Sequence, residues 1–251
     1  MTNKLRYFVA NWKMYGHLRS LNSLNKVINF RKKNKKAKNL KIIYCPPFTL
    51  LHAFVQKFKN SNIKTGAQNC SFLSTFGPPT GSINASMIKS LKCDYVILGH
   101  SEKRAKGEND KIINKKISSA LKNNLKVIFC IGETILQKRK KMTKKILLNQ
   151  LNKGLHKIKK KENILIAYEP VWSIGTGLVP KSEDLNHVIS FIKIFLRNKM
   201  KFKNPKVLYG GSVNPQNISL LRKVLNLDGF LVGGSSQNSK KFIDIIKKTF
   251  I

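Results

Sequence analysis

One glutamate in this 251-residue chain stands where a carboxylate could act as a base. The apolar, β-type run Ile164 to Tyr168 ends at Glu169, and Pro170 follows at once, with Gly175 and Gly177 a few residues later. Proline fixes one backbone angle, whereas glycine allows conformations and close ligand approach that other residues resist. The pattern predicts a strand that delivers an acid to a loop with a stiff entry and a bendable tip. It fits equally an ordinary strand-to-helix connection that happens to carry a glutamate.

A second candidate pair, Asn11 and Lys13, closes the first apolar run of the chain. Because alternate residues of a strand share a face, the amide and the ammonium should point the same way. An ammonium is a compact cation suited to a phosphate or to a developing oxyanion. The 49 basic residues include seven arginines and therefore 42 lysines, so a solvent-facing role for this lysine is the ordinary alternative.

A histidine follows the apolar run Tyr95 to Leu98, in the order His100, Ser101, Glu102. Ser101 is expected to cap a helix whose first turn carries Glu102. The positive end of the helix dipole favours the neutral imidazole of His100. A neutral ring could donate a hydrogen bond to a substrate carbonyl, and the alternative is a structural histidine at a turn.

Two glycine pairs come late in the chain, Gly210-Gly211 before Ser212, and Gly233-Gly234. Paired glycines expose backbone N–H groups, which together with a helix N-terminus form a nest for an anion. Either pair alone could be a tight turn. Both pairs at the ends of the last two apolar runs favour a phosphate site.

Eight short apolar runs rich in β-branched or aromatic residues must position these groups. Segments with helix-like apolar spacing lie between the runs, for example at 18–28, 112–121 and 185–196. Strands that alternate with helices imply a parallel sheet. The runs are Tyr7 to Trp12, Lys41 to Cys45, Ile63 to Ala67, Tyr95 to Leu98, Val127 to Ile131, Ile164 to Tyr168, Val207 to Tyr209 and Phe230 to Val232.

The number of runs predicts the fold class. Dividing 251 residues by eight gives about 31 per unit, close to one strand plus its crossover helix. We therefore expect an α/β fold, a closed (β/α)8 barrel that forms a single domain over residues 1–251. An open doubly wound sheet would more often have fewer strands and a G-x-G-x-x-G or G-x-x-x-x-G-K-[ST] loop, and neither motif occurs. In such a barrel the functional groups belong on the face where the strands end.

The charge of the chain is unusual, with 49 Lys and Arg against 11 Asp and Glu, a formal net charge of +38. A basic excess can mark a nucleic-acid-binding protein. Arginine would be preferred for bidentate phosphate or base contacts, and the lysine runs at 31–38, 138–145 and 157–161 contain no aromatic residue. A solvated basic surface is the simpler interpretation, with no specific nucleic acid expected, and polyanion binding is the alternative.

Other features bear on where the protein works. No apolar run approaches the length of a membrane-spanning helix, and the N-terminus does not resemble a secretory signal, so a cytoplasmic protein without membrane contact is expected. Four cysteines, Cys45, Cys70, Cys93 and Cys130, are far apart and form no metal-binding or disulfide pattern. Buried reduced thiols are the simplest expectation.

The strand-end motifs resemble those of the triosephosphate isomerase family, in the same order and over almost the whole chain. The resemblance is carried by Asn11-Trp12-Lys13, Ala67-Gln68-Asn69, Ile97 to Glu102, Cys130 to Thr134, Tyr168 to Trp172, Ile174 to Gly177, Tyr209 to Val213 and Gly233-Gly234. It implies a glycolytic and gluconeogenic isomerase that interconverts dihydroxyacetone phosphate and D-glyceraldehyde 3-phosphate through an enediolate.

The resemblance also implies a role for each catalytic residue. Glu169 would move a proton between two substrate carbons, and His100 would polarise the carbonyl. Lys13 and Asn11 would stabilise the negative charge, and Glu102 would support that cluster. Proton transfer between adjacent carbons requires only an acid, a base and charge stabilisation, so no metal and no organic cofactor is expected.

The same resemblance implies how the substrate is held. Closing residues 172–177 as a lid would exclude water from the reactive enediolate phosphate. The substrate and phosphate ligands would be Asn11, Lys13, Gly175, Ser212, Gly233 and Gly234.

The family resemblance further implies a homodimer. The loop Cys70 to Ile83 would insert beside the neighbouring site, with Thr80 at its tip near Asn11 and Lys13 of the other subunit. Ser82 and Lys103 depart from the usual glutamate and arginine, so both ends of a family ion pair are altered together. Removal of both partners avoids a stranded buried charge, and a homodimer with a different contact there is expected.

Two departures lie in the lid. Ser173 replaces the usual alanine, and Leu178-Val179-Pro180 occupies the exit hinge where a lysine and small residues are common. A proline removes a backbone freedom. Slower lid motion than in a typical relative is therefore expected.

Two alternative functions remain. Another phosphate-binding barrel enzyme, such as a pentose-phosphate epimerase or a phosphoribosyl-processing enzyme, could share the glycine loops but would not be expected to combine Lys13, His100 and Glu169 with this lid. A nonenzymatic polyanion-binding protein on an inherited barrel would be expected to have a damaged catalytic set.

Overall fold

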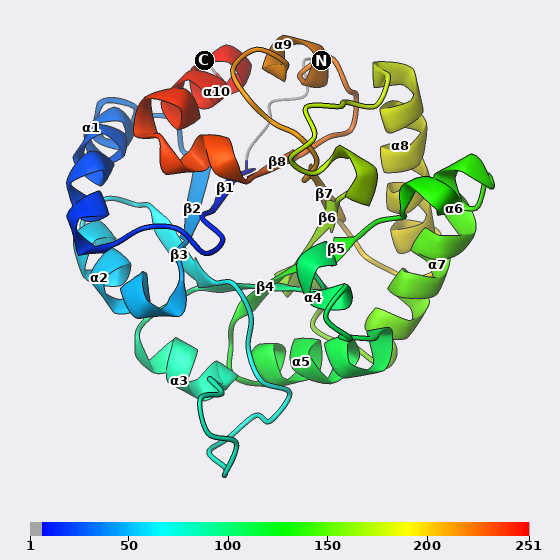
Figure 1. The fold of residues 1–251 in the computed structure, drawn as a ribbon, viewed down its shortest axis with the longest axis horizontal. Helices are drawn as coiled ribbons and strands as arrows, with labels where there is room; N and C mark the ends of the chain where they lie inside the picture. Colours follow the sequence, from blue (N-terminus) through cyan, green and yellow to red (C-terminus); the bar gives the residue numbers. More distant parts are fainter. Residues whose placement is uncertain (1–6, 251) are drawn as a thin grey trace.

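Eight parallel strands close into a barrel in the computed structural model, which describes residues 7–250 (Figure 1). Each strand pairs with the next along the chain, and β8 pairs with β1. The strands are β1 Tyr7–Asn11, β2 Lys41–Cys45, β3 Lys64–Ala67, β4 Tyr95–Leu98, β5 Lys126–Ile131, β6 Ile164–Tyr168, β7 Lys206–Tyr209 and β8 Gly229–Val232.

The predicted fold class is confirmed as a single-domain α/β fold, the TIM barrel. All eight predicted strands form, each with bounds within one residue of the prediction. The predicted domain of 1–251 includes residues 1–6 and 251, which lie outside the described residues.

Strand side chains alternate between the barrel interior and the surrounding layer of helices. A small cluster fills the interior, and a larger one that includes Phe8, Trp12 and Tyr44 packs between the strands and helices. The interior cluster consists of Val9, Ile43, Cys45, Tyr95, Ile97, Ile128, Cys130, Leu165, Ala167, Leu208 and Leu231. Asn11 and Glu169 lie two residues beyond Val9 and Ala167, so the alternation turns both inward at the end of the barrel.

Helices surround the strands on the outside (Figure 1). The predicted helical segments at 112–121 and 185–196 are confirmed within α5 and α8. The α-helices are α1 Leu24–Lys33, α2 Phe48–Phe58, α3 Ala85–Ser90, α4 Ser101–Arg104, α5 Asp110–Lys122, α6 Ile135–Arg139, α7 Thr143–Gly154, α8 Ser182–Asn198, α9 Ile218–Leu221 and α10 Ser239–Phe250. Short 3-10 helices are η1 Leu18–Ser23, η2 Lys161–Asn163, η3 Val171–Ser173 and η4 Gly234–Gln237.

The segment predicted as one helix at 18–28 is divided between η1 and α1. Serine side chains compete for the backbone at the division, since Ser23 Oγ donates to Ser20 O (2.9 Å) and the backbone N–H of His17 donates to Ser20 Oγ (3.1 Å). Such local bonds favour tight turns over a continuous α-helix.

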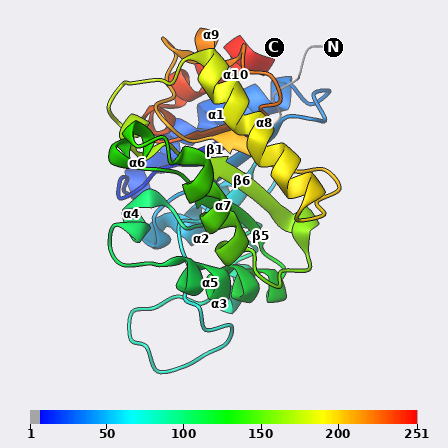
Figure 2. The same cartoon turned by 90° about the vertical axis from the view of Figure 1, so that its right-hand side faces the viewer.

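The loop between β3 and α3, residues 68–84, projects from the barrel beside α3 and α5 (Figures 1 and 2). Thr80 lies exposed in this loop, as does Phe76, whose side chain is 80% exposed. The predicted dimer contact therefore stands apart from the body of the barrel.

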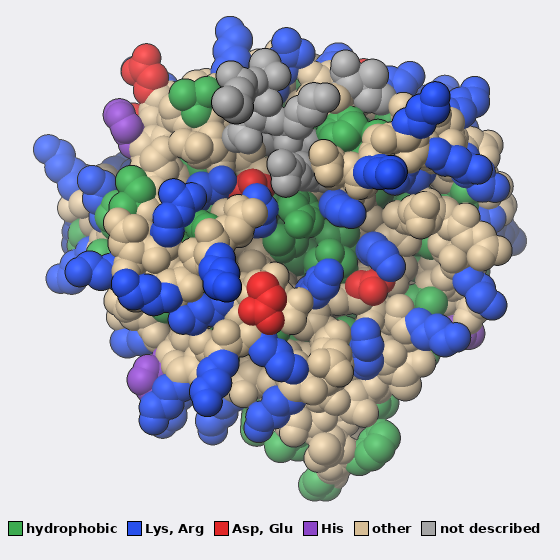
Figure 3. Space-filling view, turned by 180° about the vertical axis from the view of Figure 1, so that it is seen from behind, with side chains coloured by type: hydrophobic (Ala, Val, Ile, Leu, Met, Phe, Trp, Pro, Cys, Tyr) green, Lys and Arg blue, Asp and Glu red, His purple; other side chains and the backbone are tan. Residues whose placement is uncertain are grey.

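Basic side chains are spread over the face on which the strands begin (Figure 3). Four strands start with a lysine at this end, namely Lys41, Lys64, Lys126 and Lys206. The spread, with few acids between, fits the solvated basic surface that the composition favours.

The predicted buried reduced thiols are confirmed, since all four cysteines are buried and free. Burial raises the pKa of Cys70 to about 12. Between residues 7 and 250 no helix has both the length and the apolar character needed to cross a membrane.

Candidate active site

A cavity of ≈ 190 Å³ lies where the strands end, and the predicted site residues surround it. Asn11, Lys13, His100, Glu169, Gly175, Ser212, Gly233 and Gly234 all line it. Glu102 stands behind the lining and contacts Lys13, whereas Thr80 is not among the lining residues. The structure thus brings together residues from strands distant in sequence at one mouth of the barrel.

Glu169 points inward from the end of β6 and is 2% exposed. Its backbone N–H donates to Ile131 O (2.8 Å), which holds the chain beside β5. Burial raises the pKa of the Glu169 carboxyl, while His100 and the Cys130 thiol lower it in part. A β-carbon on Gly210 would lie 2.7 Å from Glu169 Cγ, so only glycine allows the carboxylate this position.

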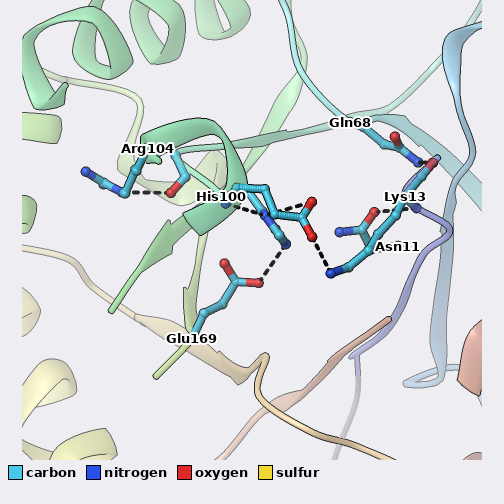
Figure 4. Close-up of polar contacts among 8 residues, drawn as sticks. Asn11, Lys13, Gln68, His100, Arg104 and Glu169 are labelled. Carbon is cyan, nitrogen blue, oxygen red and sulfur yellow. Dashed lines mark hydrogen bonds and ion pairs between the residues drawn. The ribbon is translucent and has the colours of Figure 1, made fainter. Parts of the chain in front are cut away.

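His100 contacts Glu169 beside the cavity, with Nε2 3.3 Å from Oε1 (Figure 4). Its Nδ1 accepts a hydrogen bond from the backbone N–H of Glu102 (3.2 Å). An acceptor nitrogen carries no proton, so the ring is neutral with its proton on Nε2. The expectation that Ser101 caps the helix was wrong. His100 is the N-cap of α4 and Ser101 is its first residue, because the His100 ring accepts the hydrogen bond of the Glu102 N–H.

Lys13 is held by both its backbone and its side chain. Its φ of +54° is in the left-handed region that non-glycine residues seldom adopt. Gln68 Nε2 donates to Lys13 O (2.8 Å), and the Lys13 N–H donates to Asn11 Oδ1 (3.1 Å). These bonds fix the strained turn, which delivers the ammonium to the cavity (Figure 4).

Lys13 Nζ lies 2.5 Å from Glu102 Oε1. Partial burial raises the pKa of Glu102, but the hydrogen bond from Lys13 and the nearby His100 outweigh it and leave this pKa below its usual value. Glu102 therefore stays ionised and anchors the ammonium beside the cavity.

The glycine loops after β7 and β8 also line the cavity. Gly233 passes close to the lysine, since a β-carbon there would lie 3.6 Å from Lys13 Cε. Ser236 caps the following turn, because its backbone N–H and its hydroxyl both donate to Gly233 O (2.9 and 2.6 Å). Backbone, rather than side chains, thus borders this part of the cavity.

The described residues offer no evident metal site, as no three His, Cys, Asp or Glu side chains among them gather closely enough to hold an ion.

The sequence model of the triosephosphate isomerase family matches residues 6–249. The chain belongs to the triosephosphate isomerase family. It is 40% identical over 248 residues to the triosephosphate isomerase of Dictyoglomus turgidum, an alignment that covers 96% of this chain and 98% of that protein. The relative from Bradyrhizobium sp. strain ORS 278 is 38% identical, with 98% and 99% covered. The crystal structure of the triosephosphate isomerase from Bartonella henselae has a TM-score of 0.85 to this chain at 33% identity, with 97% and 98% covered.

The activity predicted from the strand-end motifs is therefore confirmed: the chain is an enzyme of triosephosphate isomerase type. The family match also separates it from the other phosphate-binding barrel enzymes that the glycine loops alone allowed.

Sequence reasoning assigned no role to two residues that support this candidate site. Gln68 fixes Lys13, as described above, and also donates to Cys45 O (2.8 Å). Glu133, 1% exposed, accepts hydrogen bonds from Tyr168 Oη and Trp172 Nε1 (both 3.1 Å). Strand alternation turns Tyr168 away from the barrel interior, and this signal could have pointed to a polar partner outside it.

The loop predicted to act as a lid, residues 172–177, is anchored at its entry. Trp172 is held by its hydrogen bond to Glu133. It is also held by a cation–π contact, because Lys138 Nζ lies 3.6 Å from the centroid of the Trp172 ring. Gly175 and Gly177 at the tip have positive φ, and a β-carbon on either would meet no atom within 4 Å. This loop therefore combines a fixed entry with an unpacked tip.

Proposed function

We propose that Glu169 is the base of the isomerisation and that His100 is its electrophilic partner. The 3.3 Å approach of His100 Nε2 to Glu169 Oε1 carries this proposal, because a substrate bound in the cavity that both residues line would meet a base and an acid at adjacent carbons. A carboxylate whose pKa is raised by burial is a stronger base at neutral pH than an exposed one.

The reaction then proceeds through two proton transfers at carbon. Glu169 removes a proton from C1 of dihydroxyacetone phosphate, the C–H electron pair forms the C1–C2 double bond, and charge moves to the C2 oxygen. His100 donates its Nε2 proton to that oxygen and takes the proton of the C1 hydroxyl. Glu169 then returns its proton to C2, which gives D-glyceraldehyde 3-phosphate.

Charge stabilisation is assigned to Lys13, supported by Glu102, with Asn11 at its side. Lys13 lines the same cavity as His100, Glu169 and Gly233, so its ammonium can attract both the oxyanion and the phosphate. The phosphate is assigned to the backbone N–H groups of Gly175, Ser212, Gly233 and Gly234, a neutral donor set of the kind that binds anions. The lid would close residues 172–177 over the bound substrate and exclude water.

A coupled assay with D-glyceraldehyde 3-phosphate tests these assignments. Glu169→Gln keeps the shape of the side chain but cannot accept a proton at carbon, so activity should fall by roughly 10³-fold or more. Glu162→Gln, an exposed carboxylate of η2 at the other end of β6, is the matched control and should retain activity. Substantial activity in Glu169→Gln would contradict the mechanism.

We also propose that the protein is a homodimer. Exposed apolar side chains support this: Met14 is 92% exposed and Tyr15 60% exposed beside Lys13, and Phe76 is 80% exposed in the projecting loop with Thr80. Burial of such groups stabilises association. Sedimentation should give a dimer for the wild type and monomers of reduced activity for Phe76→Glu, and a fully active wild-type monomer would refute the proposal.

A cytoplasmic location and a single domain over all 251 residues complete the proposal. Four buried free thiols suit a reducing compartment. A single cooperative unfolding transition would support one domain.

A further inference from the structure

Ser173 carries a completely buried hydroxyl at the base of the lid, 0% exposed. Its Oγ donates to Leu178 O (2.5 Å), at the far end of the same loop. It also lies 2.8 Å from Tyr209 Oη and accepts from the backbone N–H of Ser212 (3.3 Å). One side chain thus joins the two ends of the lid to the loop after β7.

The proton of each group in this cluster can be assigned. A hydroxyl has one proton to donate and two lone pairs to accept. Since the carbonyl of Leu178 takes the Ser173 proton, and the N–H of Ser212 fills one lone pair, Tyr209 Oη donates to the other. The Ser173 hydroxyl is therefore saturated, and each of its three partners would lose a bond if the lid carried it away.

The loop after β7 is shaped around this hydroxyl. A β-carbon on Gly211 would lie 2.2 Å from Tyr209 Oη and 2.6 Å from Ser173 Oγ, so any other residue would displace the cluster. The contacts with Tyr209 and Ser212 consequently depend on glycine at this position.

The bond to Ser212 connects the lid to substrate binding. Ser212 lines the cavity together with Gly175, and its N–H is one of the donors assigned above to the substrate phosphate. In the observed lid position that N–H is directed at Ser173 instead. A phosphate that takes this donor must displace Ser173 Oγ.

We propose that Ser173 is a positioning residue that holds the lid in the observed position and competes with the substrate phosphate for the N–H of Ser212. The part concerning phosphate rests on the proposed function, whereas the hold on the lid does not. Release of the lid and binding of phosphate are then coupled, because the anion replaces Ser173 Oγ as the acceptor of the Ser212 N–H. The Ser173 hydroxyl therefore lowers the affinity for phosphate and gives the lid a defined resting position.

Ser173→Ala in the full-length protein is the first test. Relaxation dispersion at the Gly175 and Gly177 amides, without ligand, should show the population of the alternative lid state raised about tenfold, the equivalent of one net hydrogen bond. Ser90→Ala is the matched control, since its hydroxyl makes a local bond, to Met87 O, and it should leave the lid unchanged. Wild-type lid populations in Ser173→Ala would overturn the hold on the lid.

Phosphate affinity is the second test. With inorganic phosphate and with glycerol 3-phosphate as probes, Ser173→Ala should lower Kd roughly three- to tenfold, read from Trp172 fluorescence. In the wild type, the Ser212 amide resonance should shift on titration with either probe, a readout that does not depend on a variant folding. A released lid with unchanged Kd and a static Ser212 amide would overturn the competition. The Glu169→Gln assay tests the proposed base and does not depend on Ser173. A failure of the competition can therefore be distinguished from a failure of the proposed mechanism.

Discussion

His100 Nε2 and Glu169 Oε1 lie 3.3 Å apart, although the two residues come from β4 and β6 ends 69 positions apart in the chain. The neutral imidazole offers one N–H to the carboxylate, and the second carboxylate oxygen, Oε2, lacks a hydrogen-bond partner in the described structure. A buried oxygen left unpaired costs stability. The proposed base is therefore held at a cost in stability.

Glu169→Gln should accordingly stabilise the fold at neutral pH. The folded-state pKa of Glu169 is raised above its ordinary 4.5, so the folded state binds this proton more tightly than the unfolded chain. The stability that the carboxyl contributes is full below 4.5 and is lost as pH rises through the raised pKa. The gain at neutral pH should be about 1.4 kcal/mol for each unit by which the pKa is raised.

Urea unfolding of the wild type and Glu169→Gln between pH 4 and pH 8 measures this gain. The difference in unfolding free energy should grow with pH and then level off, while Glu162→Gln should show no such trend. A difference that stayed constant with pH would mean that Glu169 titrates normally in the fold.

Lys13→Met should remove catalysis without unfolding the protein. The Lys13–Glu102 pair is partly exposed, so its loss should change stability by no more than about 1 kcal/mol. Loss of a cation placed beside a developing oxyanion should lower kcat/KM by roughly 10² to 10³-fold. Lys64→Met, which removes an exposed lysine 3.5 Å from Asp94 at the opposite end of the barrel, is the control. Near-normal kcat/KM in Lys13→Met would exclude the assigned role.

The net charge of +38 should accelerate encounter with a phosphate dianion. Salt screens charges over about 10 Å at 0.1 M, so kcat/KM should fall about tenfold or more as salt rises from roughly 10 mM to 0.5 M. Unphosphorylated D-glyceraldehyde is the matched substrate and should show little salt dependence. Equal salt sensitivity for both substrates would argue against electrostatic steering.

The order of strands and the inward direction of the site residues could be predicted from sequence because both depend on local periodicity. Apolar runs fixed the strands within one residue, and alternation along them turned Glu169 inward. Contacts that depend on where separate loops meet could not be predicted. Gln68 reaches Lys13 across 55 positions, and Ser173 reaches Tyr209 across 36, and neither separation leaves a pattern in the sequence.

The cap of α4 was missed for a related reason. Serine is the more usual N-cap, and the choice of His100 depends on the turn after β4, which directs Nδ1 at the Glu102 N–H. The preference of serine for the N-cap is overridden here by the backbone geometry of this turn, which also orients the His100 ring in the site.

Pro180→Ala should raise the rate at which the lid opens and closes, and should shift the equilibrium between its two positions. The exit of the loop carries several restraints: Pro180 is buried with a fixed φ, its ring also restricts Val179, and Leu178 O accepts from Ser173. A proline at a compatible site contributes about 0.4 to 1 kcal/mol through chain entropy, so its removal should change the lid equilibrium roughly two- to fivefold.

Relaxation dispersion on the ligand-free protein can separate the Pro180 restraint from the Ser173 hydroxyl. If the two act independently, the free-energy changes of Pro180→Ala and Ser173→Ala should add in the double variant. If Pro180 instead acts by presenting Leu178 O to the serine, the proline change should have no effect once Ser173 is alanine. The proline does not slow the lid if the wild type opens and closes its lid as fast as a typical relative does, and if Pro180→Ala leaves that rate unchanged.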